Sequence, residues 1–413
     1  MKKILMIALD YPPCQSAGVQ RTLFFKEYLE KNGWQPLVLT AKPFIYDKYD
    51  STQINNDEHF NPPVYRAFGF NALKHFSING KHFEFTTFPD RFSTWRWDGV
   101  RIGKKIIDNE HPEVIWTTFP CSTAMYIGLK LKQNYDLPWV VDFRDPFSGT
   151  NPYIRSKNPK GKEIDEQVVK SADQFIFTTN NTADVYLKEY PFLDQSKVTI
   201  IPNGYNEKNF NGFMIDRVSE VEPVNKNTFT ILHSGFLYAG GRSIDALIMA
   251  LVELKKESVE LFNAYCFVFR GASLDSDNKL LLKKYSLENK IVFVPSISYE
   301  ESIGEMFSAD ALLVLQGEVF NNQIPGKLYE YIRAKKPIIA LAHKDGATAQ
   351  LCKNIPHASF AEINNKNHIR KALEILHDIK VDPSFDPSQF SREAGARTLK
   401  KVLESIVNDG RNK

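Results

Sequence analysis

The sequence predicts an α/β fold with two Rossmann-like domains. Short apolar runs of strand-like composition alternate with amphipathic segments, which is the pattern of parallel sheets covered by helices. The length of 413 residues is sufficient for two or three domains. The alternation stops in a polar, irregular stretch at 206–227 and then starts again, which is typical of an interdomain linker.

The first domain is expected over residues 1–205. The apolar run at its start, after two lysines, ends at Asp10 and is too short for a signal-peptide core, so we interpret it as the first strand. The predicted strands are Ile4–Leu9, Pro36–Thr40, Val114–Thr118, Trp139–Asp142, Gln174–Thr178 and Val198–Ile201. The predicted helices are Thr22–Asn32, Trp97–Asn109, Thr123–Gln133 and Gly161–Lys170.

The second domain is expected over residues 228–385 and repeats the same alternation. Its predicted strands are Thr228–Ser234, Ala264–Arg270, Ile291–Val294, Ala311–Leu315 and Pro337–Ala342. Its predicted helices are Ser243–Lys256, Tyr299–Phe307, Lys327–Ala334 and Asn367–His377. A final region, 386–413, contains a predicted helix at Gln389–Asn408 that follows a stretch with two prolines.

Composition excludes several classes of protein. The 52 Lys plus Arg residues nearly balance the 49 Asp plus Glu residues, and a formal charge of +3 does not suit a general nucleic-acid binder. Four widely spaced cysteines form no zinc or disulfide pattern and favour a reducing compartment. No run approaches the ~20 apolar residues of a membrane span. We expect a cytoplasmic protein, soluble or peripheral at the inner membrane face.

The loop after the first strand is the first place to look for a ligand, because open α/β sheets bind ligands beyond the carboxyl ends of their strands. It runs from Asp10 to Arg21 and lacks the G-x-G-x-x-G pattern that admits a dinucleotide pyrophosphate. This argues against an NAD or FAD enzyme. On spacing alone it is an ordinary strand-to-helix loop in which Gly18 supplies a turn.

The second informative segment is 322–331, which reads NQIPGKLYEY. Pro325 suits the first turn of a helix, which would leave the backbone N–H groups of Gly326, Lys327 and Leu328 unpaired. Such a terminus can bind a phosphate, and Lys327 adds a positive charge. Glu330 lies one turn further on, where it could accept hydrogen bonds from sugar hydroxyls. The alternative is a capped helix with a surface lysine and glutamate.

Six segments together resemble the GT-B glycosyltransferases, close to the retaining family 4 enzymes. They are Tyr11-Pro12-Pro13 with Gly18 and Arg21, Phe88-Pro89-Asp90 before Trp95, Asp142–Pro146, Ile201–Gly204, Ser234–Tyr238 and Ile324–Tyr331. Each is weak alone, but their order and spacing cover nearly the whole chain. The resemblance implies two domains facing a central cleft, an acceptor site on the first, a nucleotide-sugar site on the second, and a final helix that crosses back to brace the first domain.

The resemblance also assigns a donor site. The family's two glutamates, eight positions apart, map onto Asn322 and Glu330, so a neutral amide replaces the first carboxylate. The arginine position maps onto Phe236, whereas Arg242 fits the second cation and would stabilise the leaving diphosphate together with Lys327. The alternative for Arg242 is an exposed cation in a first helical turn. Other donor-site residues implied are Gly18, Gly235, Ile297 beside the base, Pro325, Gly326 and Leu328.

Catalytic and acceptor residues are implied at the end of the strand at 139–142. Arg144 occupies the position where many relatives have a histidine near the transferred sugar, and an arginine cannot act as a base at neutral pH. Arg144 would then orient the substrates, Asp145 or Asp142 would take the acceptor proton, and Tyr11 would contact the acceptor. The alternative is a structural Asp–Arg pair. No protein nucleophile and no cofactor are implied. Asp275-Ser276-Asp277 has metal-site spacing but suits helix capping, so we expect a metal-independent reaction.

The stretch 68–85 combines aromatic and basic residues. It could line an acceptor groove or touch an anionic membrane, and the alternative is a β-hairpin with packed aromatic side chains. The leading hypothesis is a transferase that moves a hexose-type sugar from a nucleotide-diphosphate donor to a glycan or lipid-linked saccharide in bacterial-type surface polysaccharide synthesis. The alternatives are a nucleotide-sugar epimerase and a catalytically silent GT-B binding protein.

Overall fold

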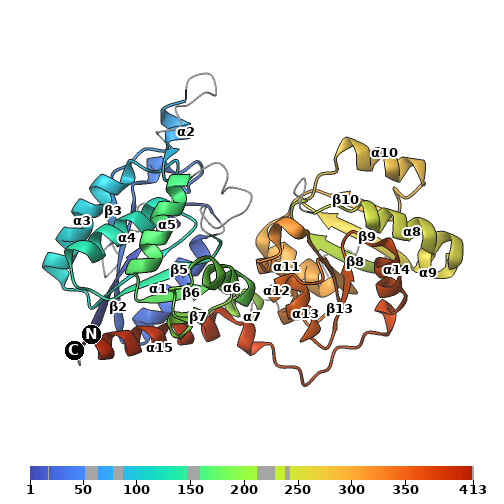
Figure 1. Ribbon diagram of the computed structural model, residues 1–413. Coiled ribbons are helices and arrows are strands. Elements are labelled where there is room, and N and C mark those ends of the chain that lie inside the picture. Colours follow the sequence, from blue (N-terminus) through green and yellow to red (C-terminus); the bar gives the residue numbers. More distant parts are fainter. Residues whose placement is uncertain are drawn as a thin grey trace. The chain divides into compact units, whose positions relative to one another are not determined.

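Two compact units make up the chain in this computed structural model (Figure 1). The structure describes residues 1–16, 18–51, 64–77, 87–146, 159–211, 228–237 and 242–411. The first unit contains Met1–Asn203 and Arg392–Lys413, and the second contains Gly204–Ser391. Each unit has a parallel sheet with helices on both faces, so the prediction of two Rossmann-like domains is confirmed.

The first unit has a seven-stranded parallel sheet in the order β3-β2-β1-β4-β5-β6-β7. Its strands are β1 (Lys2–Ile7), β2 (Trp34–Ala41), β3 (Val64–Ala67), β4 (Val114–Thr118), β5 (Trp139–Phe143), β6 (Gln174–Phe177) and β7 (Val198–Ile200). Its helices are α1 (Val19–Lys31), α2 (Ala72–His75), α3 (Trp95–Glu110), α4 (Ser122–Asn134), α5 (Pro159–Ser171), α6 (Asn180–Glu189) and α15 (Arg392–Arg411). The central strands read as continuous apolar runs because both faces of the sheet are covered.

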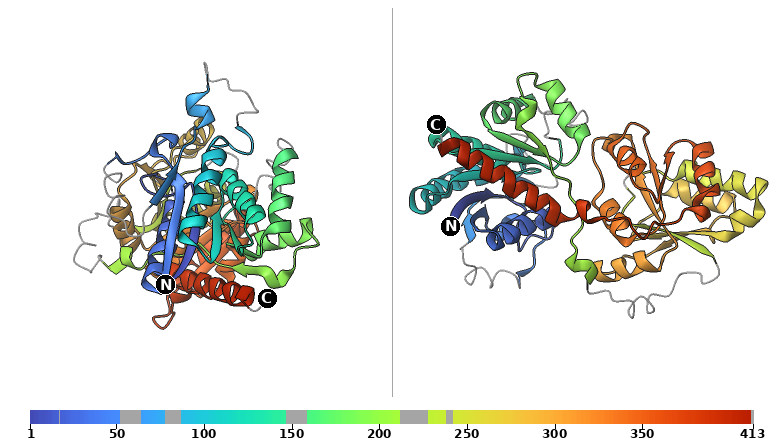
Figure 2. Two further views of the ribbon diagram at one scale, coloured as in Figure 1. Left: turned by 90° about the vertical axis from the view of Figure 1, so that its left-hand side faces the viewer. Right: turned by 90° about the horizontal axis from the view of Figure 1, so that it is seen from below.

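Alternate residues of β1 serve two separate cores. Leu5 and Ile7 face the core that also contains residues of α3 and α4, whereas Ile4 and Met6 face residues of α1 and α15. Leu399 and Leu403 of α15 belong to this second core. Figure 2 shows α15, in red, running along the first unit. The prediction that the final helix packs back on the first domain is therefore confirmed.

The second unit has a six-stranded parallel sheet in the order β10-β9-β8-β11-β12-β13. Its strands are β8 (Phe229–Ser234), β9 (Tyr265–Arg270), β10 (Ile291–Val294), β11 (Ala311–Gln316), β12 (Ile338–Ala342) and β13 (Ala358–Glu362). Its helices are α7 (Lys208–Asn211), α8 (Asp245–Glu257), α9 (Val259–Ala264), α10 (Ser276–Lys284), α11 (Tyr299–Ser308), α12 (Gly326–Ala334), α13 (Ala347–Lys353) and α14 (Lys366–Glu374).

Short 3₁₀ turns lie between these elements. They are Pro43–Ile45, Gln195–Lys197, Glu318–Phe320, Leu376–Asp378 and Ser388–Phe390. In the part of the chain that the structure describes, no helix combines the length and the apolarity that a bilayer crossing would need.

Several sequence-based expectations need correction. The stretch 68–76 is not part of a β-hairpin, because Asn71 accepts a hydrogen bond from the Leu73 backbone N–H and caps the short helix α2. Residues 78–85, the other half of that expected hairpin, lie outside the described residues. The expected linker 206–227 begins with α7, and its remainder, 212–227, is likewise not described. The edge strands β3 and β13 were not predicted, because their short sequences, VYRA and ASFAE, lack a long apolar run.

Candidate functional site

The turn after β8 in the second unit is shaped around a lysine. Gly235 has φ of +115°, a backbone conformation that residues other than glycine rarely adopt. A Cβ atom at Gly235 would also lie 2.7 Å from Nζ of Lys327. Glycine therefore suits this position for two reasons: the backbone conformation and the close approach of the Lys327 side chain.

Lys327 lies in the first turn of α12, whose amino end carries no side-chain cap. Space is open around Gly326, since nothing lies within 4 Å of the position its Cβ would take. The Leu328 N–H donates to the Pro325 carbonyl at 3.0 Å, which corrects the expectation that this group is unpaired. The amino end of a helix carries a partial positive charge that favours anions. Gly326 and Lys327 thus provide an accessible, positively polarised helix end.

The Lys327 ammonium group is held away from bulk water and donates to the Ser234 carbonyl at the end of β8. Burial, together with the positive charge of Arg242, lowers the pKa of Lys327 to about 7, and Glu330 opposes this shift. A buried cation beside a second cation is stabilised by an arriving anion. Perturbed lysines of this kind gather at functional sites.

Arg242 extends across the ends of two neighbouring strands. Its Nη1 donates to the Phe236 carbonyl at 3.1 Å and its Nη2 to Oε1 of Gln316 at 3.3 Å, at the end of β11. Its guanidinium also lies 5.7 Å from the ring centre of Phe320. Helix α8 begins only at Asp245, so Arg242 is not a cation in a helical first turn. Phe236, where the resemblance expects an arginine, is 63% exposed.

Glu330 of α12 accepts a hydrogen bond of 2.6 Å from the Tyr299 hydroxyl at the start of α11. Asn322 lies between the turn Glu318–Phe320 and α12, and Ile297 lies in the loop after β10; both are half-buried. Sequence reasoning did not assign Tyr299, because its partnership with Glu330 depends on the packing of two helices.

Tyr331 and Gln316 also belong to this site and were not assigned from the sequence. The buried Tyr331 hydroxyl accepts a hydrogen bond of 3.0 Å from the Ser234 N–H. Lys327 and Tyr331 lie one turn apart on α12, so both hold the end of β8, one through the Ser234 carbonyl and the other through its N–H. The only signal in the sequence was their spacing of four residues.

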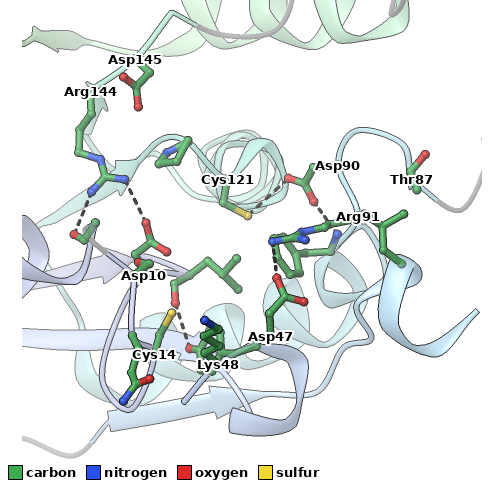
Figure 3. A pocket seen from close by; sticks show the side chains of 18 residues that line it. Asp10, Cys14, Asp47, Lys48, Thr87, Asp90, Arg91, Cys121, Arg144 and Asp145 are labelled. Atoms are coloured by element: carbon green, nitrogen blue, oxygen red, sulfur yellow. Dashed lines mark hydrogen bonds and ion pairs between the residues drawn. The ribbon is translucent and has the colours of Figure 1, made fainter. Parts of the chain in front are cut away.

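A pocket of about 1010 Å³ lies in the first unit (Figure 3). It opens beyond the carboxyl ends of β1, β2, β4 and β5, where parallel sheets place ligands. The residues that line it are Leu9, Asp10, Cys14, Gln15, Ser16, Gly18, Tyr46, Asp47, Lys48, Leu73, Thr87, Asp90, Arg91, Phe92, Pro120, Cys121, Arg144 and Asp145. It therefore combines carboxylates, guanidinium groups and apolar walls.

Arg144 is fixed at one side of this pocket by three contacts. Its guanidinium donates to Oδ2 of Asp10 at 3.0 Å, to the Gly18 carbonyl at 2.8 Å and to the Phe119 carbonyl at 2.7 Å. A Cβ atom on Gly18 would lie 1.9 Å from the Asp10 carboxylate and 2.6 Å from the Arg144 guanidinium. Gly18 is thus required by an ion pair inside the first unit, a reason that the sequence did not reveal.

Asp145 follows Arg144 and lines the same pocket (Figure 3). Burial raises the pKa of the Asp145 carboxyl above its usual value, while the neighbouring Arg144 charge partly opposes the shift. A carboxyl group with a raised pKa is better suited to exchange a proton near neutral pH than an ordinary surface aspartate. Arg144 and Asp145 are the two predicted catalytic residues that the fold brings to this pocket.

The structure places the expected acceptor residues Asp142 and Tyr11 in the interior of the first unit. Asp142 is fully buried and accepts hydrogen bonds from Nε and Nη2 of Arg21 at 2.8 and 3.0 Å. Tyr11 is completely buried in the apolar core beside Ile4 and Met6. Neither side chain lines the pocket. Asp142 instead forms the structural Asp–Arg pair that the sequence left open, with Arg21 as its partner.

Two further motifs have structural uses. Asp90 accepts hydrogen bonds of 2.7 Å from the Thr123 N–H and 2.8 Å from the Thr123 hydroxyl, so it fixes the start of α4 at the pocket wall. Asp275 accepts from the Asn278 N–H at 2.8 Å and caps α10, as its position before a helix predicted.

Residues 20–209, most of the first unit, match the profile of Glycosyltransferase Family 4. The chain is similar to the GT-B glycosyltransferases of family 4. No curated protein matches it at a significant level.

Solved structures share the fold over nearly the full length at low identity. Sucrose-phosphate synthase from Thermosynechococcus elongatus is 14% identical with a TM-score of 0.63, and the match covers 100% of this chain and 98% of that one. Anabaena HepE in complex with UDP is 14% identical with a TM-score of 0.66 and coverage of 98% and 100%. UDP-GlcNAc 2-epimerase from Methanocaldococcus jannaschii is 14% identical with a TM-score of 0.55 and the same coverage. These likenesses show the GT-B fold.

The lowered pKa of Lys327 predicts a pH-dependent stability. Between about 7 and 10.5 the unfolded lysine holds a proton that the folded one lacks, so the stability of the unliganded protein rises with pH. Lys327→Met should therefore melt about 3 °C or more above the wild type near pH 6 and lose this advantage by about pH 10. Thermal melts across this range measure the difference. A difference that does not change with pH, or one shared by the exposed-lysine control Lys344→Met, contradicts the assignment.

Proposed function

We propose that the chain is a glycosyltransferase that moves a sugar from a nucleotide-diphosphate sugar to a glycan or a lipid-linked saccharide. The transfer would proceed with retention of configuration and without a metal ion, in bacterial-type surface polysaccharide synthesis. The observation that carries the proposal is the Lys327 ammonium group, held at the uncapped end of α12 beside Arg242.

The donor diphosphate would bind at the amino end of α12. Negative charge grows on the diphosphate as the bond to the sugar breaks, and fixed cations at that point stabilise the transition state more than the bound donor. Lys327 and Arg242 supply the positive charge that a metal ion provides in other transferases. Glu330, held by Tyr299, would accept hydrogen bonds from the donor ribose. HepE, a structural neighbour, has been solved with UDP and with UDP-glucose, which supports a uridine nucleotide as the first to test.

The acceptor would bind in the pocket of the first unit. Saccharides are bound by planar polar groups next to apolar surface, and this pocket has both. Arg144, fixed by Asp10 and the Gly18 carbonyl, would orient the acceptor. The Asp145 carboxylate would accept the proton of the attacking hydroxyl, since burial raises the pKa of this group above its usual value.

Nucleotide binding should depend on Lys327, Arg242 and Glu330. A nucleotide that binds only the folded protein increases the free energy of unfolding, by about 2.7 kcal/mol at a nucleotide concentration 100 times the Kd. The melting temperature rises accordingly. We expect UDP, GDP or ADP to stabilise the wild type and Lys344→Met alike. Lys327→Met, Arg242→Ala and Glu330→Ala should lose most of this stabilisation in the same thermal-shift titration.

Other outcomes of that titration point to other functions. Stabilisation that survives all three substitutions places the donor elsewhere and contradicts the site. Tight binding without hydrolysis or transfer of any common nucleotide sugar favours a silent binding protein, which the exposed Phe236 in place of an arginine supports. Interconversion of a nucleotide sugar without an acceptor favours an epimerase, an activity named for one structural neighbour.

Asp145 should matter for transfer and not for donor binding. Asp145→Asn keeps the shape of the side chain but removes its proton acceptor, so the transfer rate should fall by about 100-fold or more, while the Kd of the donor changes less than about twofold. The control is Asp184→Asn, an exposed aspartate on α6 of the same unit. The measurement is the transfer rate of the wild type and of both variants with the best donor and acceptor. An Asp145→Asn enzyme of wild-type rate would show that Asp145 takes no proton.

We also propose that the tip around α2 touches the inner membrane face, where a lipid-linked acceptor would lie. Helix α2 stands out from the rest of the first unit (Figure 1). Phe68, Leu73 and Phe76 are 43%, 40% and 38% exposed and lie on or beside it. Lys74 donates to the Phe44 and Tyr46 carbonyls, so apolar contact would supply most of the affinity.

Liposome flotation tests the membrane proposal. The wild type should float with vesicles that contain anionic lipid. The double substitution Leu73→Ser with Phe76→Ser should reduce the floated fraction at least about threefold, because both apolar side chains that would enter the bilayer are lost. Phe192→Ser, at an exposed phenylalanine elsewhere on the first unit, is the matched control. A wild type that stays at the bottom of the gradient at low salt contradicts the proposal.

A further inference from the structure

The loops after β8, β9 and β10 are joined by backbone hydrogen bonds that continue the sheet beyond its last paired residues. The Gly235 N–H donates to the Arg270 carbonyl at 2.8 Å, and the Gly271 N–H donates to the Val294 carbonyl at 2.9 Å. Gly271 has φ of +70°, and a Cβ atom there would come within 3.4 Å of Cβ of Ser296. The loop after β10 therefore packs directly on the turn after β9.

The side chain of Arg270 joins the loop after β10 to helix α11. Its Nη1 donates to the Pro295 carbonyl at 2.8 Å, in the loop after β10. Its Nε and Nη2 donate to the Glu305 carboxylate of α11, at 3.0 and 2.6 Å. The side chains of Arg270 and Glu305 are only 15% and 10% exposed. Paired, two-pronged contacts of this kind between an arginine and a carboxylate are strong and fix the plane of the guanidinium.

We propose that Arg270 is a positioning residue that holds the loop Pro295–Ile297 in place, against the turn after β9 and beside Glu305 of α11. This inference rests on the proposed function, in which the diphosphate binds at the amino end of α12, and on the expected place of Ile297 beside the nucleobase. Pro295 and Ser296 are exposed and lie outside any helix or strand. Arg270 would thus set the position of the loop that contacts the base, while the phosphate contacts of Lys327 are made independently.

A lysine cannot replace Arg270 in this role. The planar guanidinium reaches the Glu305 carboxylate and the Pro295 carbonyl at once, because its donors point in several fixed directions. The single ammonium of a lysine keeps the charge opposite Glu305 and so avoids leaving that carboxylate buried without a partner. Arg270→Lys should therefore release the loop while it keeps a positive charge opposite Glu305.

The test compares nucleotide with pyrophosphate binding to the full-length protein. The Kd values of UDP, GDP, ADP and inorganic pyrophosphate are measured by calorimetry for the wild type, Arg270→Lys and the control Arg370→Lys. Arg370 is a second arginine that bridges two glutamates, Glu257 and Glu374, away from these loops. For Arg270→Lys we expect the tightest nucleotide to weaken about tenfold while pyrophosphate changes less than about twofold. Arg370→Lys should change neither.

Each other result overturns the proposal. Equal weakening of nucleotide and pyrophosphate in Arg270→Lys shows a general structural role, and unchanged affinities show no role in binding. If the wild type binds no nucleotide, the proposed function and this inference fail together. If the wild type binds a nucleotide and only the selective loss is absent, the proposed function stands and the role of Arg270 is rejected.

Discussion

The candidate donor site of the second unit depends on the position of one ammonium group. Lys327 is placed at the end of β8 by the start of α12, and it fits there only because Gly235 has no side chain. Tyr331, one turn further along the helix, holds the same strand end through the Ser234 N–H. Moving a cation out of water costs free energy, and the lowered pKa of Lys327 reflects this cost. A bound diphosphate would recover it, so the feature that destabilises the unliganded protein is the one suited to bind the donor.

In the first unit, buried arginines are paired with aspartates. The buried Arg21–Asp142 pair joins α1 to the end of β5, and Arg21 also donates to the carbonyls of Ile201 and Pro202, just before the chain leaves the unit. Beside it, the Asp10–Arg144 pair forms one side of the pocket. Both arginines are almost fully buried. Because each is anchored by several hydrogen bonds, Arg144 presents a fixed surface to a ligand and Asp145 keeps its place next to it.

Periodicity and composition were sufficient to predict the two parallel sheets, because fully covered strands such as β1 and β11 must be continuous apolar runs. They were insufficient for the edge strands β3 and β13, and for α2, which depends on a single cap at Asn71. Within the site, Lys327 and Glu330 followed from a helix start that a proline marks. The burial of Asp142 and Tyr11 could not be predicted, because sequence position shows that a residue is near a strand end but not which face it occupies. Arg270, Tyr299 and Tyr331 act through partners far away in the sequence, which no local pattern reveals.

A crystal structure of the chain soaked with UDP tests the central claim most directly, since it shows where the diphosphate binds. We expect the β-phosphate at the amino end of α12, within hydrogen-bond distance of the Gly326 N–H and Nζ of Lys327, with Arg242 alongside. We also expect the ribose hydroxyls at Glu330 and the base against the loop Pro295–Ile297. A diphosphate bound at any other place in the second unit, with Lys327 still directed only at Ser234, would contradict the account.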